Sequence, residues 1–401
     1  MKVSIIGQGY VGLTIAAFAG ESYEVVGFDN NQKIVDQLNL GISHIEGVES
    51  LVLKNWIKEG RFKATINGGD INGSDIVVIA VPTPLSKDRQ PDLTYIEAAC
   101  KTVGENLKNS ALIINESTSF PGTIRNFIKP SIEKYSDGKL EHLYAISPER
   151  VDPGRGDFNQ KNTPRLYAGL TPEASRRTKE FYSKFCDQLV EVSSPEVAEA
   201  AKLFENTFRQ VNIALVNEFA QITNALGISV YETLDAANTK PYGFMKFTPS
   251  AGVGGHCIPV DPSYLAAVAE ERGVPATFIR RANEVNLEMS KYVVDRVETD
   301  NGGSLQGKSV LVVGVAYKPN VADVRETAAE LVIEHLRARG AVVAWHDDVV
   351  GTWHGEKSSD LTGADIAIVI TKHDEVQTKA IMASAPYVFD TTGKLPQANG
   401  L

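Results

Sequence analysis

The stretch "KVSIIGQGYVGLTIAAFAG", residues 2–20, carries the strongest fold signal in the chain. A short β-rich run meets a glycine-rich turn, and "GLTIAAFAG" then has the apolar spacing of a helix. Gly7, Gly9 and Gly12 form G-x-G-x-x-G between the two. The first glycine permits a tight turn, the second lets the backbone approach a pyrophosphate, and the third allows close helix–strand packing. The N–H groups at the helix start are then free to bind phosphates.

Asp29 supports this interpretation, because a glycine turn alone also serves as a plain strand–helix connection. It ends the next strand-like run, "YEVVGFD", 17 residues after Gly12. A carboxylate at that place binds the ribose hydroxyls of a dinucleotide and repels a 2′-phosphate. The unit therefore predicts NAD as the cofactor in preference to NADP.

The alternation of strands and helices continues outward from this unit. "SDIVVIAVPTP", "ALIINEST" and "LYAISPER" are apolar runs of the kind buried in parallel sheets. From Pro195 to Gly227 the apolar spacing is helical with no internal Gly or Pro, which predicts a helix that bridges domains or lines a subunit interface. After the turn-rich "NGGSLQGK", the run "SVLVVGVAYKP" restarts the strand–turn–helix pattern. The fold class is α/β, with two Rossmann-like doubly wound domains joined by a long central helix and a helical middle region.

Composition and charge narrow the class of function. The chain has 401 residues, is 43% hydrophobic, and carries a formal net charge of −10 without a run of Lys/Arg, which argues against a nucleic-acid binder. No apolar run approaches the roughly 18 residues that span a bilayer, and the start lacks the features of a signal peptide. The three cysteines have no CxxC spacing and indicate free thiols. We therefore expect a cytoplasmic protein without membrane or nucleic-acid partners.

Cys257 lies in "GVGGHCIPVDP", between a glycine run and two prolines. From the residues alone it is a buried small hydrophobe, a metal ligand, half of a disulfide or a nucleophile. A zinc site would need further Cys or His at short spacing, and none occurs, so we predict no metal. The dense glycines favour a loop lying against a ligand.

Further candidates share a helix face or follow strands. Lys202 and Asn206 are four residues apart on the long helix, so they either stabilise an oxyanion together or form a solvated face. Glu149 follows a strand of the first domain, where ligands of open α/β sheets bind. Lys318 and Arg325 follow the first strand of the last domain and could pair with phosphates, or lie at the surface.

Taken together, these motifs resemble the UDP-glucose/GDP-mannose dehydrogenase family over nearly the whole chain. The motifs that carry the resemblance are "GQGYVGL", "VPTP", "STSFPGT", "SPER", "AAKLFENTFRQVNIALVNE", "GVGGHCIPVDP" and "GVAYKPNVADVRET". The resemblance implies an NAD-binding domain (1–193), a helical dimerisation domain with the cysteine loop (194–300) and a UDP-sugar-binding domain (301–401). It also implies a homodimer and a four-electron oxidation of the sugar C6 alcohol to a uronate, through a cysteine thiohemiacetal and thioester.

The resemblance also implies roles for individual residues. Cys257 is the nucleophile, Lys202 and Asn206 stabilise the negative oxygen, Asp261 activates water or supports Lys202, and Thr118 and Glu149 position water and relay protons. The positions that match cofactor contacts are Gly7, Gly9, Tyr10, Val11, Gly12, Asp29, Thr83, Thr118 and Arg325. Those that match substrate contacts are Glu149, Arg150, Lys202, Asn206, the loop from Phe247 to Gly254 (with Gly252) and Lys318.

Departures from the family pattern bear on the substrate. His256 before the cysteine, and "IPVDP" after it, resemble the branch that oxidises UDP-N-acetylmannosamine and UDP-N-acetylglucosamine. UDP-glucose and GDP-mannose are the alternative substrates. The alternative functions are a two-electron dehydrogenase and a catalytically silent nucleotide-sugar binder. Val260 replaces a family lysine, and Lys33 stands one position from a usual basic residue. Family members often have an arginine before the cysteine loop that reaches the substrate of the partner subunit, but the region "NTKPYGFMKF" has none. Lys240 or Lys246 would substitute for it as a point charge.

Overall fold

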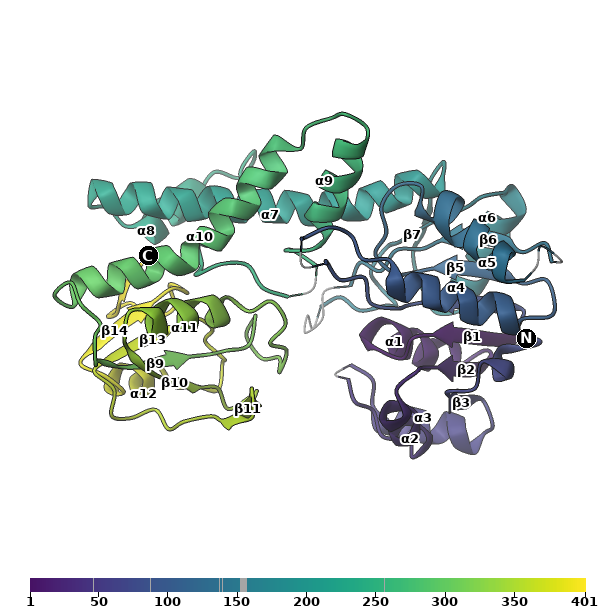
Figure 1. The fold of residues 1–401 in the computed structure, drawn as a ribbon, viewed down its shortest axis with the longest axis horizontal. Helices are drawn as coiled ribbons and strands as arrows, with labels where there is room; N and C mark the ends of the chain where they lie inside the picture. Colours follow the sequence, from purple (N-terminus) through teal and green to yellow (C-terminus); the bar gives the residue numbers. More distant parts are fainter. Residues whose placement is uncertain (46, 87, 137, 139, 152–156, 256) are drawn as a thin grey trace. The chain divides into compact units, whose positions relative to one another are not determined.

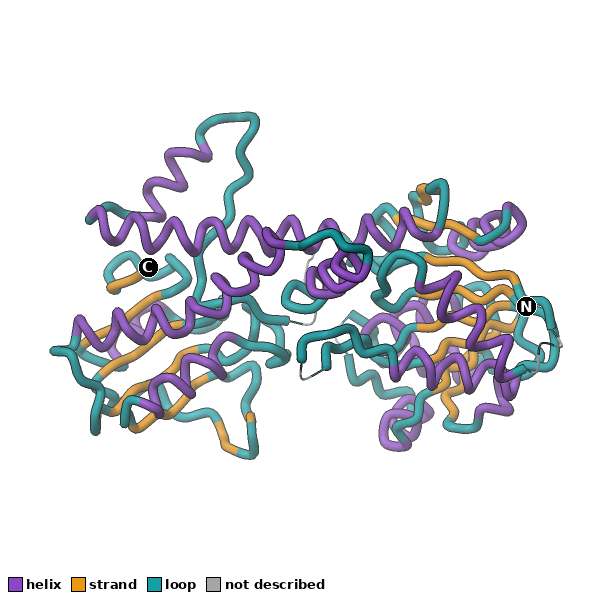
Figure 2. The backbone as a smooth tube through the Cα atoms, turned by 45° about the horizontal axis from the view of Figure 1, so that its top comes forward, coloured by secondary structure: helices purple, strands orange, loops and turns teal. Residues whose placement is uncertain are grey.

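The computed structural model describes residues 1–401 except 46, 87, 137, 139, 152–156 and 256. The chain divides into two compact units, Met1–Phe204 (the N-terminal unit) and Glu205–Leu401 (the C-terminal unit), and helix α7 (Pro195–Leu226) runs through the boundary (Figure 1). Figure 2 shows strands flanked by helices in each unit. No helix among the described residues is long and apolar enough to cross a membrane.

The N-terminal unit alternates strands and helices, as the sequence predicts. Its strands are β1 (Lys2–Ile6), β2 (Glu24–Phe28), β3 (Phe62–Thr65), β4 (Ile76–Ile79), β5 (Leu112–Asn115), β6 (Leu143–Ile146), β7 (Arg165–Gly169) and β8 (Leu189–Glu191). Its helical elements are α1 (Tyr10–Ala19), α2 (Gln32–Asn39), α3 (Ser50–Lys58), the 3-10 helix η1 (Gly68–Ile71), α4 (Thr94–Asn106), the π-helical turn η2 (Ile124–Ile128), α5 (Lys129–Tyr135) and α6 (Pro172–Tyr182).

The order of the strands defines a doubly wound sheet: β3-β2-β1-β4-β5-β6-β7-β8. All neighbouring pairs are parallel except β6 and β7, which are antiparallel. The chain reverses its winding between β1 and β4, and the loops at the carboxyl ends of strands next to such a point form the usual ligand crevice. Because β7 runs backwards, its first residue, Arg165, lies at this same edge.

Two apolar layers cover the faces of the N-terminal sheet. One face carries Val3, Ile5, Val78 and Ile114 and packs under residues of α1 and α6, while the other carries Ile6, Val77, Ile79 and Ile113 and packs under α4 and α5. Successive residues of β1 and β4 therefore point to opposite cores, which explains why β4 is apolar at every position.

The C-terminal unit contains the rest of α7, further helices and a second parallel sheet in the order β10-β9-β13-β14-β15. The helices are α8 (Val230–Asn238), α9 (Asp261–Glu271), α10 (Thr277–Asp300), α11 (Ala328–Ala338) and α12 (Thr378–Ala383). The strands are β9 (Ser309–Val313), β10 (Val342–His346), the hairpin β11 (Thr352–Trp353) with β12 (Glu356–Lys357), β13 (Ile366–Val369), β14 (Tyr387–Asp390) and β15 (Asn399–Gly400). The predicted Rossmann-like α/β class holds in both units.

The second sheet repeats the plan of the first. α10 and α11 pack on one face of the sheet and α12 on the other. Gly314 follows β9 with a φ of +81°, and its backbone passes so close to Thr371 that a Cβ would lie 1.9 Å from the Thr371 carbonyl oxygen. Asp347 follows β10 and accepts hydrogen bonds from the N–H groups of Val315 and Ala316. These positions correspond to Gly7 and Asp29 of the N-terminal unit, although no sequence repeat connects them.

Candidate active site

The three glycines of the first turn have distinct surroundings. Gly7 has a φ of +94°, and a Cβ on it would lie 2.4 Å from the Ala80 carbonyl oxygen. A Cβ on Gly12 would lie 1.9 Å from the Gly7 carbonyl oxygen. A Cβ on Gly9 would meet nothing within 4 Å. Gly7 and Gly12 therefore make room for backbone packing, whereas Gly9 keeps the space before α1 open.

The surroundings of this turn fit a dinucleotide. α1 begins at Tyr10 and Val11 directly after Gly9, without a side chain capping its N–H groups, so these can bind phosphate. The Asp29 carboxylate accepts hydrogen bonds from Gln8 N and Asn31 N, each at 2.9 Å, which fix it at the end of β2. Each carboxylate oxygen retains a lone pair for a ribose hydroxyl. Thr83, 2% exposed, lies in the loop after β4.

Lys202 is buried, so a solvated helix face is the wrong interpretation for it. Its side chain is 8% exposed, and its Nζ donates a hydrogen bond of 2.8 Å to Thr118 Oγ1 in the loop after β5. The two residues are 84 positions apart in sequence, and the N-terminal unit brings them together. An ammonium held in a protein interior is a donor that can stabilise a developing oxyanion strongly.

Glu199, one turn before Lys202, is a site residue that the sequence did not reveal. Its carboxylate accepts hydrogen bonds from Gly122 N at 2.6 Å, Ile124 N at 3.2 Å and Ser119 Oγ at 3.2 Å. Burial raises the pKa of this carboxyl to about 7. Glu199 thus ties the loop that carries Thr118 to α7.

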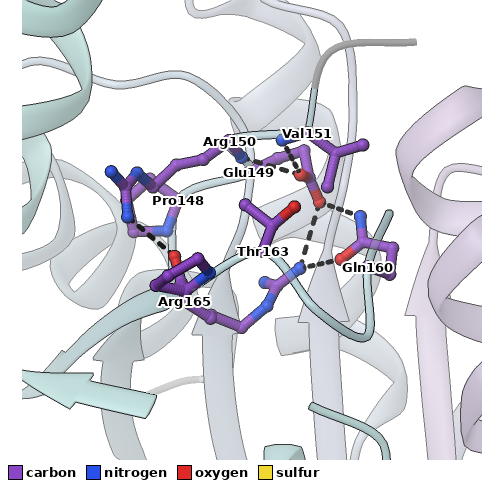
Figure 3. A pocket seen from close by; sticks show the side chains of 8 residues that line it. Pro148, Glu149, Arg150, Val151, Gln160, Thr163 and Arg165 are labelled. Atoms are coloured by element: carbon purple, nitrogen blue, oxygen red, sulfur yellow. Dashed lines mark hydrogen bonds and ion pairs between the residues drawn. The ribbon is translucent and has the colours of Figure 1, made fainter. Parts of the chain in front are cut away.

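Glu149 lies after β6 and is fixed from four sides (Figure 3). Its Oε1 accepts hydrogen bonds from Arg150 N at 2.7 Å and Val151 N at 2.6 Å. Its Oε2 lies 3.0 Å from Arg165 Nη2 and also accepts a hydrogen bond from Gln160 Nε2. Burial opposes ionisation, but the positive charges of Arg165 and Lys202 and the hydrogen bonds lower the pKa of the Glu149 carboxyl. Arg150 itself donates from Nη1 to the Pro164 carbonyl oxygen at 2.7 Å.

The second buried carboxylate beside Glu149 is Glu116, directly after β5. Its Oε2 lies 3.1 Å from Arg165 Nη1, and Tyr182 donates its hydroxyl to Oε1. Burial raises the pKa of Glu116, and the negative charge of Glu149 adds to that effect. We call Glu116, Glu149, Gln160, Arg165 and Tyr182 the buried carboxylate cluster.

In the C-terminal unit, Cys257 lies four residues before the start of α9 and is exposed, whereas Cys100 and Cys186 are buried. Its carbonyl oxygen accepts a hydrogen bond from Asp261 N at 2.8 Å. Asp261 is fully buried, and its Oδ2 accepts a hydrogen bond of 2.6 Å from Asn206 Nδ2. The structure therefore joins two residues, Asn206 and Asp261, that the sequence placed separately. No group of His, Cys, Asp and Glu among the described residues has the arrangement of a metal site.

The glycines before Cys257 pack against other segments of the C-terminal unit. A Cβ on Gly254 would lie 2.8 Å from Tyr317 Cβ, and one on Gly255 would lie 2.8 Å from the Tyr317 ring. Gly252 has a φ of +149° and packs against Ala328 and Asn286. The missing Cβ atoms of these glycines therefore allow neighbouring segments of the same unit to pack closely against the loop.

The loop after β9 lies beside the cysteine loop. Gly255 N donates a hydrogen bond of 2.9 Å to the Arg325 carbonyl oxygen. The Arg325 side chain is exposed and pairs with Asp323, which raises its pKa, with a smaller contribution from the nearby Cys257. Lys318 has its Nζ 5.6 Å from the centre of the Tyr317 ring. Both cations therefore lie on the segment that contacts the cysteine loop.

Other sequence candidates are placed as follows. Phe247 is half-buried and packs edge-on against Phe208 with ring centres 6.0 Å apart. Lys246 is paired with Asp235 in the same unit, and Lys240 lies over the Tyr242 ring. Lys33 is exposed on α2, Val260 is buried, and His256 lies outside the described residues.

The fold and these groups define a class of protein: a two-unit NAD-dependent dehydrogenase with an exposed thiol on its second unit. Three family models of the UDP-glucose/GDP-mannose dehydrogenase family match the chain: the NAD binding domain at residues 1–186, the central domain at 196–288 and the UDP binding domain at 311–397. The chain belongs to this family, and it is an NAD-dependent nucleotide-sugar dehydrogenase.

Similar proteins match over most of the chain. A UDP-N-acetyl-D-mannosamine dehydrogenase of Pyrococcus horikoshii is 34% identical over 94% of this chain and 91% of its own length. A UDP-N-acetyl-D-glucosamine 6-dehydrogenase of Pseudomonas aeruginosa is 36% identical over 84% of this chain and 80% of its own length. Among solved structures, the UDP-D-ManNAc dehydrogenase of Pyrococcus horikoshii has a TM-score of 0.90 at 32% identity, covering 100% of this chain and 99% of that one.

Proposed function

We propose that this dehydrogenase oxidises the C6 alcohol of a UDP-N-acetylhexosamine to the uronate in two steps, with Cys257 as the nucleophile. The exposure of Cys257 carries the proposal, since the other two thiols are buried in the core. NAD supplies the chemistry that the side chains lack: it accepts a hydride at each of two oxidations. Residues 1–193 would hold NAD, residues 194–300 the dimer contacts and the cysteine loop, and residues 301–401 the UDP-sugar.

The side chains have complementary roles in this reaction. The alcohol first loses a hydride and a proton to give an aldehyde, and the Cys257 thiolate adds to the aldehyde carbon to form a thiohemiacetal. Loss of the second hydride and a proton gives a thioester, which water cleaves to the carboxylate with release of the thiol.

Lys202 and Asn206 supply donors for the oxygen that becomes negative in these steps. Thr118, which accepts from Lys202, and Glu149 orient the water and move its protons, while Asp261 holds Asn206 in place. Two further sets of contacts belong to the same proposal. The cofactor contacts are those of Gly7, Gly9, Tyr10, Val11, Gly12, Asp29, Thr83, Thr118 and Arg325, and the substrate contacts are those of Arg150, Phe247, Gly252, Gly254 and Lys318.

The sugar is an N-acetylhexosamine on two grounds: the sequence around Cys257, and the names of the relatives from Pyrococcus and Pseudomonas. We expect UDP-N-acetylmannosamine or UDP-N-acetylglucosamine to be oxidised faster than UDP-glucose or GDP-mannose, measured as NADH absorbance at equal concentrations. Turnover of UDP-glucose or GDP-mannose alone would contradict the assignment. Binding of every sugar without NADH formation would favour a silent nucleotide-sugar binder.

We also propose a homodimer formed through α7. Its exposed side carries Val197, Phe204, Phe208, Leu215, Ile222 and Leu226, at intervals of four or seven residues, so these side chains form one stripe along the helix. Leu215 is 63% exposed and Leu226 67%. A continuous apolar stripe on a helix of 32 residues is the surface that a second copy of the same helix covers. The free thiols are consistent with a cytoplasmic location.

Replacing Leu215 by glutamate is expected to convert the dimer to a monomer, because a charge would be buried at the centre of the stripe. Sedimentation equilibrium measures the change in mass. Asn224→Glu, which adds the same charge at an exposed α7 position outside the stripe, should leave the mass of the assembly unchanged. Monomeric wild-type protein would refute the proposal.

A further inference from the structure

The buried carboxylate cluster contains two carboxyl groups, those of Glu116 and Glu149, but only one arginine. Arg165, 4% exposed, lies between the carboxylates of Glu116 and Glu149, with its two terminal nitrogens 3.1 and 3.0 Å from their oxygens. The planar guanidinium suits this arrangement, because its fork presents several donors at fixed angles. Arg165 Nη1 also donates to Ser147 Oγ at 3.1 Å, and Nη2 donates to Gln160 Oε1.

The Arg165 side chain is itself fixed by a stacking contact with Tyr182. Its guanidinium carbon lies 4.5 Å from the centre of the Tyr182 ring, at the end of α6, and the Tyr182 hydroxyl bonds to Glu116. Cys186 donates to the Gln160 carbonyl oxygen at 3.4 Å and closes the same region. Stacking and two anionic partners leave this side chain one orientation.

Four partners hold the two oxygens of Glu149 in one orientation. Two backbone N–H groups occupy Oε1, and Arg165 and Gln160 occupy Oε2. The carboxylate therefore cannot rotate without losing bonds, and Arg165 is the partner that carries a charge.

We infer that Arg165 is a positioning residue, which fixes the Glu149 carboxylate for the reaction while Glu116 and Tyr182 fix Arg165. This inference rests on the role proposed for Glu149. It assigns a task to a residue that touches neither sugar nor cofactor in the proposed mechanism. It also explains why the antiparallel strand β7 begins at the ligand edge of the sheet.

The charge balance of the cluster predicts its dependence on pH. The titratable or charged groups that face Glu149 or Arg165 are Glu116 after β5, Tyr182 of α6, Cys186 and Lys202 of α7. Burial raises the pKa of Glu116 and the positive charge of Arg165 opposes that rise, so Arg165 is the cation that faces both carboxyl groups. Without Arg165, the proton affinity of Glu149 rises, and the group protonates at a higher pH.

Arg165→Met is expected to move the acidic limb of the pH–kcat profile upward by about one to three pH units. At pH 6 kcat should fall about tenfold or more, with KM for the UDP-sugar within about threefold of wild type. Arg165→Lys should move the acidic limb less than Arg165→Met, because the positive charge remains. It should still lower kcat, because the lysine ammonium lacks the planar set of donors of a guanidinium. Glu116→Gln should not move the acidic limb upward, because it removes a carboxyl group beside Glu149 and leaves the positive charge of Arg165 in place.

Arg61→Met is the matched control for lost stability in the same unit. Arg61 donates to the Gly20 and Glu21 carbonyl oxygens and lies over the Trp56 ring, and none of these partners belongs to the cluster. A lower melting temperature in both arginine variants, with the acidic limb of each unchanged, would show that Arg165 is only structural. A change confined to KM would also overturn the inference. If Arg165→Met does not fold, Arg165→Lys provides the same comparison.

An infrared titration separates this inference from the proposed function. The carboxyl band of Glu149, identified by difference from Glu149→Gln, should appear at higher pH in Arg165→Met than in wild type, and this needs no turnover. A wild-type protein that oxidises no sugar would refute the proposed function alone, whereas an unmoved Glu149 band would refute the role of Arg165 alone.

Discussion

Cys257→Ser is expected to lower uronate formation by at least about a thousandfold while NAD binding and the fold persist. A serine hydroxyl at neutral pH is a far weaker nucleophile than a thiolate, and it adds poorly to the aldehyde carbon. Cys257 is exposed before α9, so the substitution disturbs no core packing. Uronate measured by chromatography, together with cofactor titration and the melting temperature, tests the three parts of this expectation.

Cys100→Ala is the control for the loss of a thiol. Burial raises the pKa of Cys100 to about 12, so this group stays a neutral thiol and takes no part in covalent chemistry. The variant should cost some stability through a small cavity beside α4 but retain uronate formation. Wild-type rates in Cys257→Ser would remove the nucleophile from the mechanism and leave a two-electron dehydrogenase.

The second prediction with a large expected effect is that alanine substitutions at Gly9 and Gly12 act on different properties, NAD binding and stability respectively. Gly9→Ala should leave the melting temperature unchanged, because the added Cβ meets nothing within 4 Å, but weaken NAD binding by about tenfold or more, since the methyl occupies the space before α1. Gly12→Ala should instead destabilise the N-terminal unit by about 1–3 kcal/mol, because its Cβ would lie 1.9 Å from the Gly7 carbonyl oxygen. Thermal melting and cofactor fluorescence measure both.

The pair is decisive because each variant adds the same methyl group. Normal NAD affinity in a folded Gly9→Ala protein would mean that the phosphates do not approach this turn. An unchanged melting temperature in Gly12→Ala would mean that α1 and β1 pack less closely than the structure has them.

The sequence predicts the first sheet well because its signals are local. The glycine turn, Asp29 and the apolar strands each lie within a short window, and the structure places them as a doubly wound unit. The long helix is equally clear, since apolar spacing without Gly or Pro runs from Pro195 to the glycine that ends it, Gly227, with a φ of +70°. Such features need no knowledge of distant contacts.

The buried carboxylate cluster was missed because it depends on the direction of one strand. Parallel strands would put the first residue of β7 at the opposite edge from Glu149, but β7 is antiparallel to β6. Glu116 gave a weak signal, as an acid directly after an apolar strand, and Arg165 gave none. The burial of Lys202 was likewise invisible, because its partner Thr118 is 84 residues away.

The neighbours of the glycines before Cys257 could not be predicted for a related reason. A run of glycines shows that something approaches the backbone closely, but not what approaches. Here the neighbour is Tyr317, in a loop some sixty residues further along the chain. Local sequence cannot distinguish a ligand from a distant loop.

The stoichiometry of NADH to sugar tests the central claim most directly. With limiting UDP-N-acetylhexosamine and excess NAD, the two-step oxidation through Cys257 predicts two NADH for each sugar consumed, with the uronate as the product. One NADH for each sugar, with an aldehyde or ketone as the product, would contradict the account.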